Sequence, residues 1–199
     1  DGDADRVVAV TADGSLKEGD DLLAVLATHP DYAQQQTYVS TIMANFGLTT
    51  HFEKFGKQLL RTDVGDKHIA QALTDHTLLL GAEPSGHIIL SNISSSGDGI
   101  LAALKVVETA LLTNNHHLHS FIKAPQSLIN VPIRQKMALT DEPLASIISA
   151  RRAALAQGRI VVRYSGTEPL LRILAEGEDA VSVESNANLL AHDLQKILS

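Results

Sequence analysis

The sequence predicts an α/β protein of two units: an α/β layer with parallel strands, followed by a smaller α+β unit. Strand-like and helix-like apolar patterns alternate from about residue 36 to residue 112, which is typical of an α/β layer. A polar segment over residues 113–126 interrupts the alternation, and a second pattern of strands and helices begins after it. Of the 199 residues, 44% are hydrophobic and 20% are charged, so the chain has enough apolar material to fold.

A short segment precedes the first unit. Residues 7–10 are a β-type apolar run that the turn-like residues 12–15 close. Asp20 or Asp21 then caps a helix that carries four apolar side chains within residues 22–26. We interpret the opening segment as the tail of an earlier domain that passes into the next one.

The remaining elements follow from the period of the apolar residues. In the first unit we expect strands at residues 37–43, 58–62, 77–80 and 87–90, and helices at residues 45–57, 65–73 and 97–112. In the second unit we expect strands at residues 128–134, 159–164 and 170–176, and helices at residues 142–157 and 179–198. The first set is a layer of strands and helices, and the second is a compact α+β unit.

These elements divide the chain into four segments. We expect residues 1–18 to be a stub of a preceding domain, residues 19–124 an α/β domain, residues 125–130 a linker and residues 131–199 an α+β domain. The sequence has no initiator Met and opens on three acidic residues, so we expect it to be a piece of a longer protein.

Composition excludes several classes of function. The 16 Lys and Arg against 23 Asp and Glu give a net charge of −7, which argues against a nucleic-acid partner. Without cysteine there is no disulfide framework, thiol catalysis or thiolate metal site. No apolar run approaches the roughly 18 residues of a membrane span, and no signal peptide opens the chain. We therefore expect a soluble cytoplasmic protein with no membrane partner.

Three carboxylates open the chain at alternate positions, in Asp1, Asp3 and Asp5. A loop that turns them inward would hold a hard cation such as Mg²⁺. An EF-hand loop is excluded because Arg6 stands at the sixth position, where that loop needs Gly. The alternative is a solvated acidic turn, although a guanidinium beside a cation is typical of phosphoryl transfer.

Two later loops carry groups suited to a sugar phosphate. Residues 81–87 lie between two strands. There Glu83 and Ser85 could form hydrogen bonds with neighbouring sugar hydroxyls, or only with the backbone groups of their own turn. Residues 163–169, with Arg172 beyond them, resemble an anion nest with two guanidiniums that could clamp a phosphate. The alternative for this second loop is a plain strand connection with Gly166 at positive φ.

A histidine group at His116, His117 and His119 also suggests a metal site. These residues lie in a polar Asn-rich turn with no carboxylate nearby, so a solvated turn is the better interpretation.

Five motifs in this order resemble the α-D-phosphohexomutases. They are Asp1-Gly2-Asp3-Ala4-Asp5-Arg6, Val64-Gly65-Asp66-Lys67, Gly81-Ala82-Glu83-Pro84-Ser85-Gly86-His87, Ser96-Gly97-Asp98-Gly99 and Arg163-Tyr164-Ser165-Gly166-Thr167-Glu168-Pro169. Together they span almost the whole chain. The amino-acid sequences of the third and fifth motifs most resemble those of members that act on glucosamine phosphates. Members that act on mannose or glucose phosphates are the alternative.

The resemblance implies a four-domain enzyme with its active site in a cleft between domains. Residues 1–18 would be a stub of domain 2 with the metal loop, residues 19–124 domain 3 with the sugar loop, and residues 131–199 domain 4 with the phosphate loop. The family implies a role for each matching residue. Asp1, Asp3 and Asp5 would hold Mg²⁺; Arg6, Lys67 and His87 would support catalysis; Glu83, Ser85, Arg163, Ser165, Gly166, Thr167 and Arg172 would bind substrate.

The family reaction implies an isomerase of carbohydrate and amino-sugar metabolism. A phosphoserine on domain 1 gives its phosphoryl group to the sugar phosphate, and a bisphosphate intermediate reorients before a phosphoryl group returns to the serine. On this resemblance the chain interconverts glucosamine 6-phosphate and glucosamine 1-phosphate only together with the missing N-terminal domains. Alone it lacks the catalytic serine, and we expect it to be inactive. A non-catalytic module that binds sugar phosphates is the alternative from another class.

Overall fold

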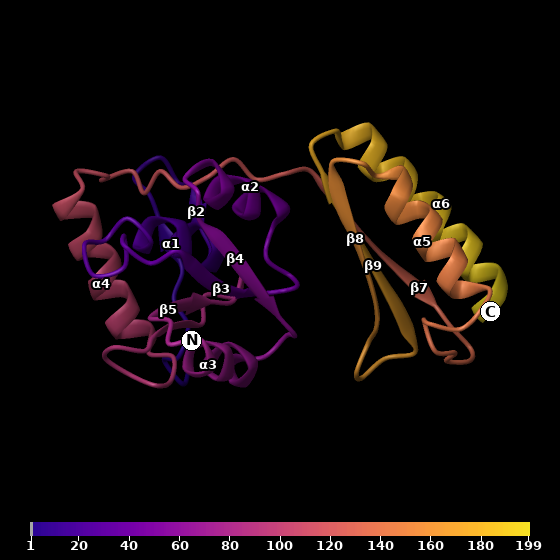
Figure 1. The fold of residues 1–199 in the computed structure, drawn as a ribbon, viewed down its shortest axis with the longest axis horizontal. Helices are drawn as coiled ribbons and strands as arrows, with labels where there is room; N and C mark the ends of the chain where they lie inside the picture. The colour runs from indigo at the N-terminus through magenta and orange to yellow at the C-terminus, as the bar shows by residue number, and fades with distance from the viewer. Residues whose placement is uncertain (1) are drawn as a thin grey trace. The chain divides into compact units, whose positions relative to one another are not determined.

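The structure is a computed structural model that describes residues 2–199, and these residues form two compact units that divide between residues 123 and 124 (Figure 1). Each unit has its own hydrophobic core and is described by itself. Within the described residues, no helix is long and apolar enough to cross a membrane.

The first unit is built on a four-stranded sheet with the order β4-β3-β5-β6. Its strands are β3 (Thr37–Thr41), β4 (Gln58–Thr62), β5 (Leu80–Ala82) and β6 (Ile88–Leu90). Strand β3 pairs in parallel with β4 and β5, as the sequence predicts. Strand β6 pairs antiparallel with β5, because the connection from Ala82 to Ile88 is a tight turn and a parallel crossover needs many more residues.

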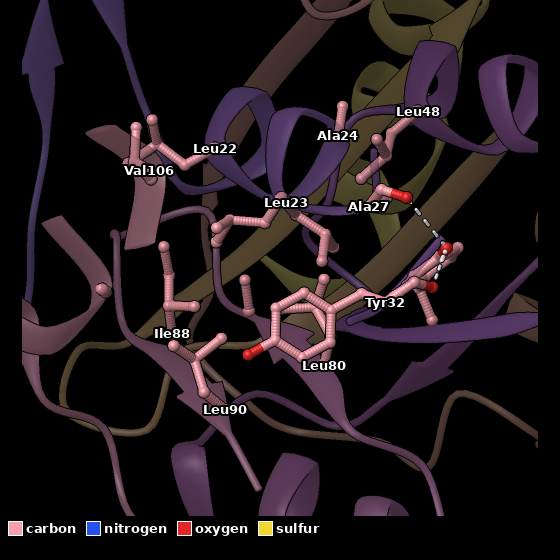
Figure 2. Packing of buried hydrophobic residues seen from close by; sticks show 14 of the residues in the cluster. Leu22, Leu23, Ala24, Ala27, Tyr32, Leu48, Leu80, Ile88, Leu90 and Val106 are labelled. Atoms are coloured by element: carbon pink, nitrogen blue, oxygen red, sulfur yellow. Dashed lines mark hydrogen bonds between the residues drawn. The ribbon is translucent and has the colours of Figure 1, made fainter. Parts of the chain in front are cut away.

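Four helices cover this sheet. They are α1 (Gly19–Leu26), α2 (Phe46–Lys54), α3 (Asp66–Asp75) and α4 (Gly99–Leu112). The larger core joins α1, α2 and α4 to one face of the sheet, and Figure 2 shows Leu22 and Leu23 of α1 among Leu80, Ile88 and Leu90 of the strands. A smaller core packs α3 against the other face through Ile69 and Leu73. The unit is therefore a three-layer α/β/α structure.

The opening segment packs on this unit. Strands β1 (Ala9–Val10) and β2 (Leu16–Lys17) form a two-stranded antiparallel ribbon. Before the ribbon, the amide of Val7 donates to the carbonyl of Gly86 at 3.0 Å, and the amide of Gly99 donates to the carbonyl of Ala4 at 2.8 Å. These bonds hold residues 4–7 against the turn between β5 and β6 and against the start of α4.

The second unit is a three-stranded antiparallel sheet with the order β7-β9-β8. Its strands are β7 (Gln126–Pro132), β8 (Gly158–Tyr164) and β9 (Leu170–Gly177), and its helices are α5 (Leu144–Ala154) and α6 (Ala180–Leu198). Side chains from one face of the sheet, such as Val131, Val162 and Ile173, pack with both helices into a single core. The α+β prediction for this unit is confirmed.

Several predicted boundaries are wrong. Residues 126–130 are strand, not linker, because β7 bonds along its whole length to β9 from Gln126 to Pro132. The strand predicted at 77–80 lies at Leu80–Ala82. Helix α2 ends at Lys54 and Gly56 has a φ of +67°, which a helix does not continue. Helix α4 begins at Gly99 because the Asp98 carboxylate caps it, accepting the amide of Leu101 at 2.9 Å.

Candidate functional site

Three loops follow the carboxyl ends of the parallel strands of the first unit. Residues 42–45 follow β3, residues 63–65 follow β4 and residues 83–87 follow β5. Because the three strands are parallel and adjacent in the sheet, the three loops lie at the same sheet edge. Open α/β sheets bind their ligands at this edge.

The turn between β5 and β6 is tightly built and contains both predicted sugar-binding residues. The Glu83 amide donates to the His87 carbonyl at 2.8 Å, and Gly86 closes the turn with a φ of +94°, which favours glycine. Glu83 is half-buried, and its Oε1 accepts the amide of Gly65 at 3.0 Å. Ser85 is exposed. One carboxylate oxygen of Glu83 is thus used to tie two loops together, and Oε2 and the Ser85 hydroxyl are the groups available to a ligand.

His87 connects this turn to the acidic opening segment. Its Nδ1 lies 3.1 Å from Oδ2 of Asp5, and its ring packs so closely on Gly97 that a Cβ at position 97 would collide with it. Although partial burial acts to raise it, the pKa of Asp5 is lowered by the hydrogen bond and charge of His87 and by Arg6, whose Nε lies 3.6 Å from Oδ1. His87 therefore orients Asp5.

The predicted metal loop is only partly described. Asp1 lies outside the described residues, and Asp3 is exposed. Among residues 2–199, no three His, Asp or Glu side chains gather closely enough to hold a metal ion. The donors nevertheless suit Mg²⁺: they are carboxylate oxygens, and Oδ1 of Asp5 is buried without a hydrogen-bond partner.

Two further predicted groups lie at the edges of these motifs. Lys67 is exposed in the first turn of α3, directly after the loop of residues 63–65. His116, His117 and His119 lie in the turn after α4, where Oδ1 of Asn115 accepts the amide of His119 at 2.8 Å. The histidines hold no metal cluster within the described part of the chain.

In the second unit, two arginines stand side by side. Arg163 of β8 and Arg172 of β9 are directly paired across the strands. Like charges in directly opposed positions are unfavourable without a counterion. The Glu168 carboxylate accepts from Nη2 of Arg172 at 2.8 Å, while Nε of Arg172 is buried and unpartnered. The pair has more donors than the one carboxylate uses, as an anion site requires.

The loop beside these arginines presents its tip to solvent. Ser165 is buried, and its Oγ accepts the amide of Glu168 at 3.3 Å, which fixes the loop from inside. Gly166 and Thr167 are exposed, and a Cβ at Gly166 would meet no atom within 4 Å. Gly166 does not have a positive φ, so that part of the alternative interpretation is wrong. The structure thus places all five predicted residues at the connection between β8 and β9, and their binding of phosphate stays a prediction: Arg163, Ser165, Gly166, Thr167 and Arg172.

The sequence missed a polar network that holds the loop of residues 42–45. Oδ2 of Asp20 accepts the amide of Asn45 at 2.7 Å, and the Arg61 guanidinium donates to the carbonyls of Thr41 and Ala44 at 3.1 and 2.7 Å. The sequence predicts Asp20 only as a possible helix cap and Asn45 only as the first residue of a helix. The available signal was the pair Asp20-Asp21, since one helix start needs only one capping carboxylate.

The chain belongs to the phosphohexomutase family, as its motifs predict. The family model of phosphoglucomutase/phosphomannomutase alpha/beta/alpha domain III matches residues 18–128, and that of the C-terminal domain matches residues 128–192. The fold prediction is thereby also confirmed.

Known members agree with this assignment. A phosphoglucosamine mutase of Zymomonas mobilis is 41% identical over 186 residues, which cover 90% of this chain and 42% of the relative. A phosphoglucosamine mutase of Rhizobium etli is 38% identical over 206 residues, 100% of this chain and 46% of the relative. The crystal structure of Aspergillus fumigatus N-acetylphosphoglucosamine mutase in complex with GlcNAc-6P and magnesium has a TM-score of 0.75 at 20% identity, over 100% of this chain and 48% of that one. This chain spans less than half the length of these relatives.

Proposed function

We propose that this chain supplies the sugar-binding and phosphate-binding domains of a phosphosugar mutase that interconverts glucosamine 6-phosphate and glucosamine 1-phosphate. The observation that carries the proposal is the cross-strand pair of Arg163 and Arg172 beside a loop of exposed backbone and hydroxyl groups. The similarity to phosphoglucosamine mutases supports an amino sugar as the substrate.

The residues of this chain bind and orient the substrate. Arg163 and Arg172 neutralise the phosphate, and Ser165, Gly166 and Thr167 line the loop that receives it. Glu83 accepts hydrogen bonds from sugar hydroxyls through Oε2, and Ser85 donates or accepts beside it. In the proposed reaction the phosphoryl group comes from a serine of a preceding domain and passes through a sugar bisphosphate.

Mg²⁺ belongs to the same proposal. Asp1, Asp3 and Asp5 would hold it, and when bound it would supply charge neutralisation for the phosphoryl group. Arg6 and Lys67 add positive charge, and His87 fixes the orientation of Asp5. Titration of the complete protein with Mg²⁺, followed by the amide resonances of residues 2–6, tests this assignment. No change at millimolar Mg²⁺ contradicts it.

Activity of the complete protein tests the substrate. In the presence of Mg²⁺, we expect turnover of glucosamine phosphate with a kcat/KM well above those for glucose and mannose phosphates. We also propose that the protein acts in the cytoplasm. Preference for glucose or mannose phosphate would favour the phosphoglucomutase/phosphomannomutase alternative. No turnover of any of the three, with intact binding, would favour a binding module. Residues 1–199 alone should show no turnover, because the proposed phosphoryl donor belongs to another domain.

Phosphate binding by this chain directly tests the proposed role of Arg163 and Arg172, which we call the phosphate clamp. We expect inorganic phosphate to shift the amide resonances of residues 165–167, and Arg163→Ala or Arg172→Ala to weaken the affinity at least about tenfold, because each removes a charged bidentate donor worth about 1.5–3 kcal/mol. Arg151→Ala is the matched control: Arg151 lies on α5 and pairs with Asp193 of α6. Equal losses in all three variants, or shifts centred on His116 to His119, would show that the clamp is wrongly assigned.

A further inference from the structure

The first turn of α1 contains two adjacent buried carboxylates with different surroundings. The N-cap residue of α1 is Glu18, not Asp20 or Asp21 as the sequence predicts, and Asp21 completes the capping box. Its Oδ2 accepts the amide of Glu18 at 3.1 Å, and its Oδ1 accepts the Ser120 hydroxyl at 2.7 Å. Asp20 instead reaches 25 residues along the chain to the amide of Asn45, and its Oδ1 is buried with no hydrogen-bond partner. Only one of the two carboxylates is needed to start the helix.

Asn45 ends the loop that follows β3. Its side-chain oxygen accepts the amide of Gly47 at 2.9 Å and so caps α2, while its own amide is held by Asp20. The Arg61 guanidinium donates to three carbonyls of the same stretch, those of Thr41, Ala44 and Asn45. The loop of residues 42–45 is thus held in place by hydrogen bonds to the Asp20 carboxylate and the Arg61 guanidinium.

The residue before Asp20 contacts the predicted sugar loop. The Gly19 amide donates to the Pro84 carbonyl at 3.1 Å, and Gly19 lies so close to the Glu83 carbonyl oxygen that a Cβ would collide with it. Glu83 in turn accepts the amide of Gly65. Two consecutive residues of α1 therefore join the loops that follow β3 and β5, and the second of these loops is joined to the one that follows β4.

We propose that Asp20 is a positioning residue of the substrate site, whose carboxylate holds the loop of residues 42–45 in place relative to the sugar loop of residues 83–87. The loop of residues 42–45 then takes part in shaping the sugar site, although no motif marks it. The effect of Asp20 on substrate rests on the proposed function, whereas the coupling of the two loops does not.

A buried carboxylate with an unpartnered oxygen costs free energy of folding. Capping the helix does not require that cost, since Glu18 and Asp21 already form the capping box of α1. Groups that lower stability and fix a loop are concentrated at functional sites. This cost favours a role in the site over a purely structural one.

The same burial brings the protonation of Asp20 into a pH range that is easily measured. Burial raises its pKa to about 6, against the opposing effects of the Asn45 amide and the charge of Arg61; Asp21 raises it further and Lys123 lowers it. Its protonation is therefore measurable near neutral pH through the amide that it holds.

Amide resonances of the 199-residue chain, followed from pH 5 to pH 7.5, test the coupling. We expect the amides of Asn45, Gly19 and Gly86 to shift with a common midpoint near the pKa of Asp20 in wild type and in Asp21→Asn, and to lose that shift in Asp20→Asn. Asp20→Ala should also remove the hydrogen-exchange protection of the Asn45 amide. A shift of Asn45 alone, with Gly19 and Gly86 unmoved, or a shift that persists in Asp20→Asn, overturns the proposal.

Binding of glucosamine 6-phosphate tests the effect on substrate. We expect Asp20→Asn to raise Kd about tenfold, equivalent to about 1.4 kcal/mol, and Asp21→Asn to leave it within about twofold. Inorganic phosphate should bind both variants equally, because its proposed clamp lies in the other unit. If wild type binds no sugar phosphate, the proposed function fails while the amide shifts still decide the coupling. If wild type binds and both variants bind equally well, the positioning role is wrong.

Discussion

At the scale of single residues, Asp20 gives the stability of the first unit a pH dependence of defined sign. The pKa of this carboxyl is raised by burial to about 6, whereas its ordinary value is 3.8. The folded state therefore binds the proton more tightly than the unfolded state does. The free energy of unfolding contributed by this group is highest below pH 4 and falls as the pH rises through 6.

We expect Asp20→Asn to flatten this part of the pH profile. The difference between 6 and 3.8 corresponds to about 3 kcal/mol between pH 4 and pH 7, at roughly 1.4 kcal/mol for each pH unit. Urea unfolding of wild type and variant across this range measures it. Glu53→Gln, which removes one exposed carboxylate, corrects for the change in net charge. Parallel profiles for wild type and Asp20→Asn would contradict the expectation.

At this scale the sequence indicates the candidate ligand groups, whose binding role stays a prediction, but not the buried groups that hold their loops. Glu83, Ser85 and Arg163 stand in short motifs whose chemistry is local, so the sequence alone indicates them. Asp20 and Asn45 meet across 25 residues, and that contact exists only after α1 and β3 have packed. A carboxylate before an apolar run has the same sequence pattern whether it caps a helix or holds a distant loop.

At the scale of elements, the start of α1 is limited by the space beside Gly19. Alanine is favoured over glycine in a helix by about 1 kcal/mol. Here we expect Gly19→Ala to destabilise the first unit by roughly 1–3 kcal/mol, because its Cβ would meet the backbone of Glu83 and Gly86, which cannot rotate away.

Denaturant unfolding of Gly19→Ala measures this loss. Gly166→Ala is the control, since a Cβ at Gly166 meets open space and its φ is not positive. The variant should also shift the amide resonances of Glu83 and Gly86, since α1 must move away from the turn. A Gly19→Ala variant as stable as wild type would mean that the close approach of α1 to this turn is wrong.

The types of the elements followed from the apolar period, while their ends and pairings depended on other contacts. Helices α4 and α6 are long and apolar on one side, and their positions agree with the prediction to within two residues. Strand β5 lies further along the chain than predicted, because its hairpin with β6 and its parallel register with β3 fix it at Leu80–Ala82. The polar start of β7 resembled a linker because its pairing with β9 is not visible in the sequence.

At the scale of the whole molecule, the two units have separate cores. Each residue of the second core, from Val131 to Leu198, comes from the second unit, and the sheet β7-β9-β8 is complete within it. Three antiparallel strands packed on helices meet the usual requirement for independent stability. The family models also change from one domain to the next at residue 128.

We therefore expect residues 124–199 to fold alone and to keep the phosphate affinity that we propose for Arg163 and Arg172. The 76 residues from 124 to 199 are close to the size at which one core supplies only about 3–5 kcal/mol, so the unfolding midpoint should be modest. Urea unfolding should be a single cooperative transition, and dispersed amide resonances should respond to phosphate at residues 165–167 as they do in the longer chain. Arg163→Ala in this piece should remove that response without changing the dispersion. Collapsed resonances and a transition without cooperativity would mean that the second core depends on residues before 124.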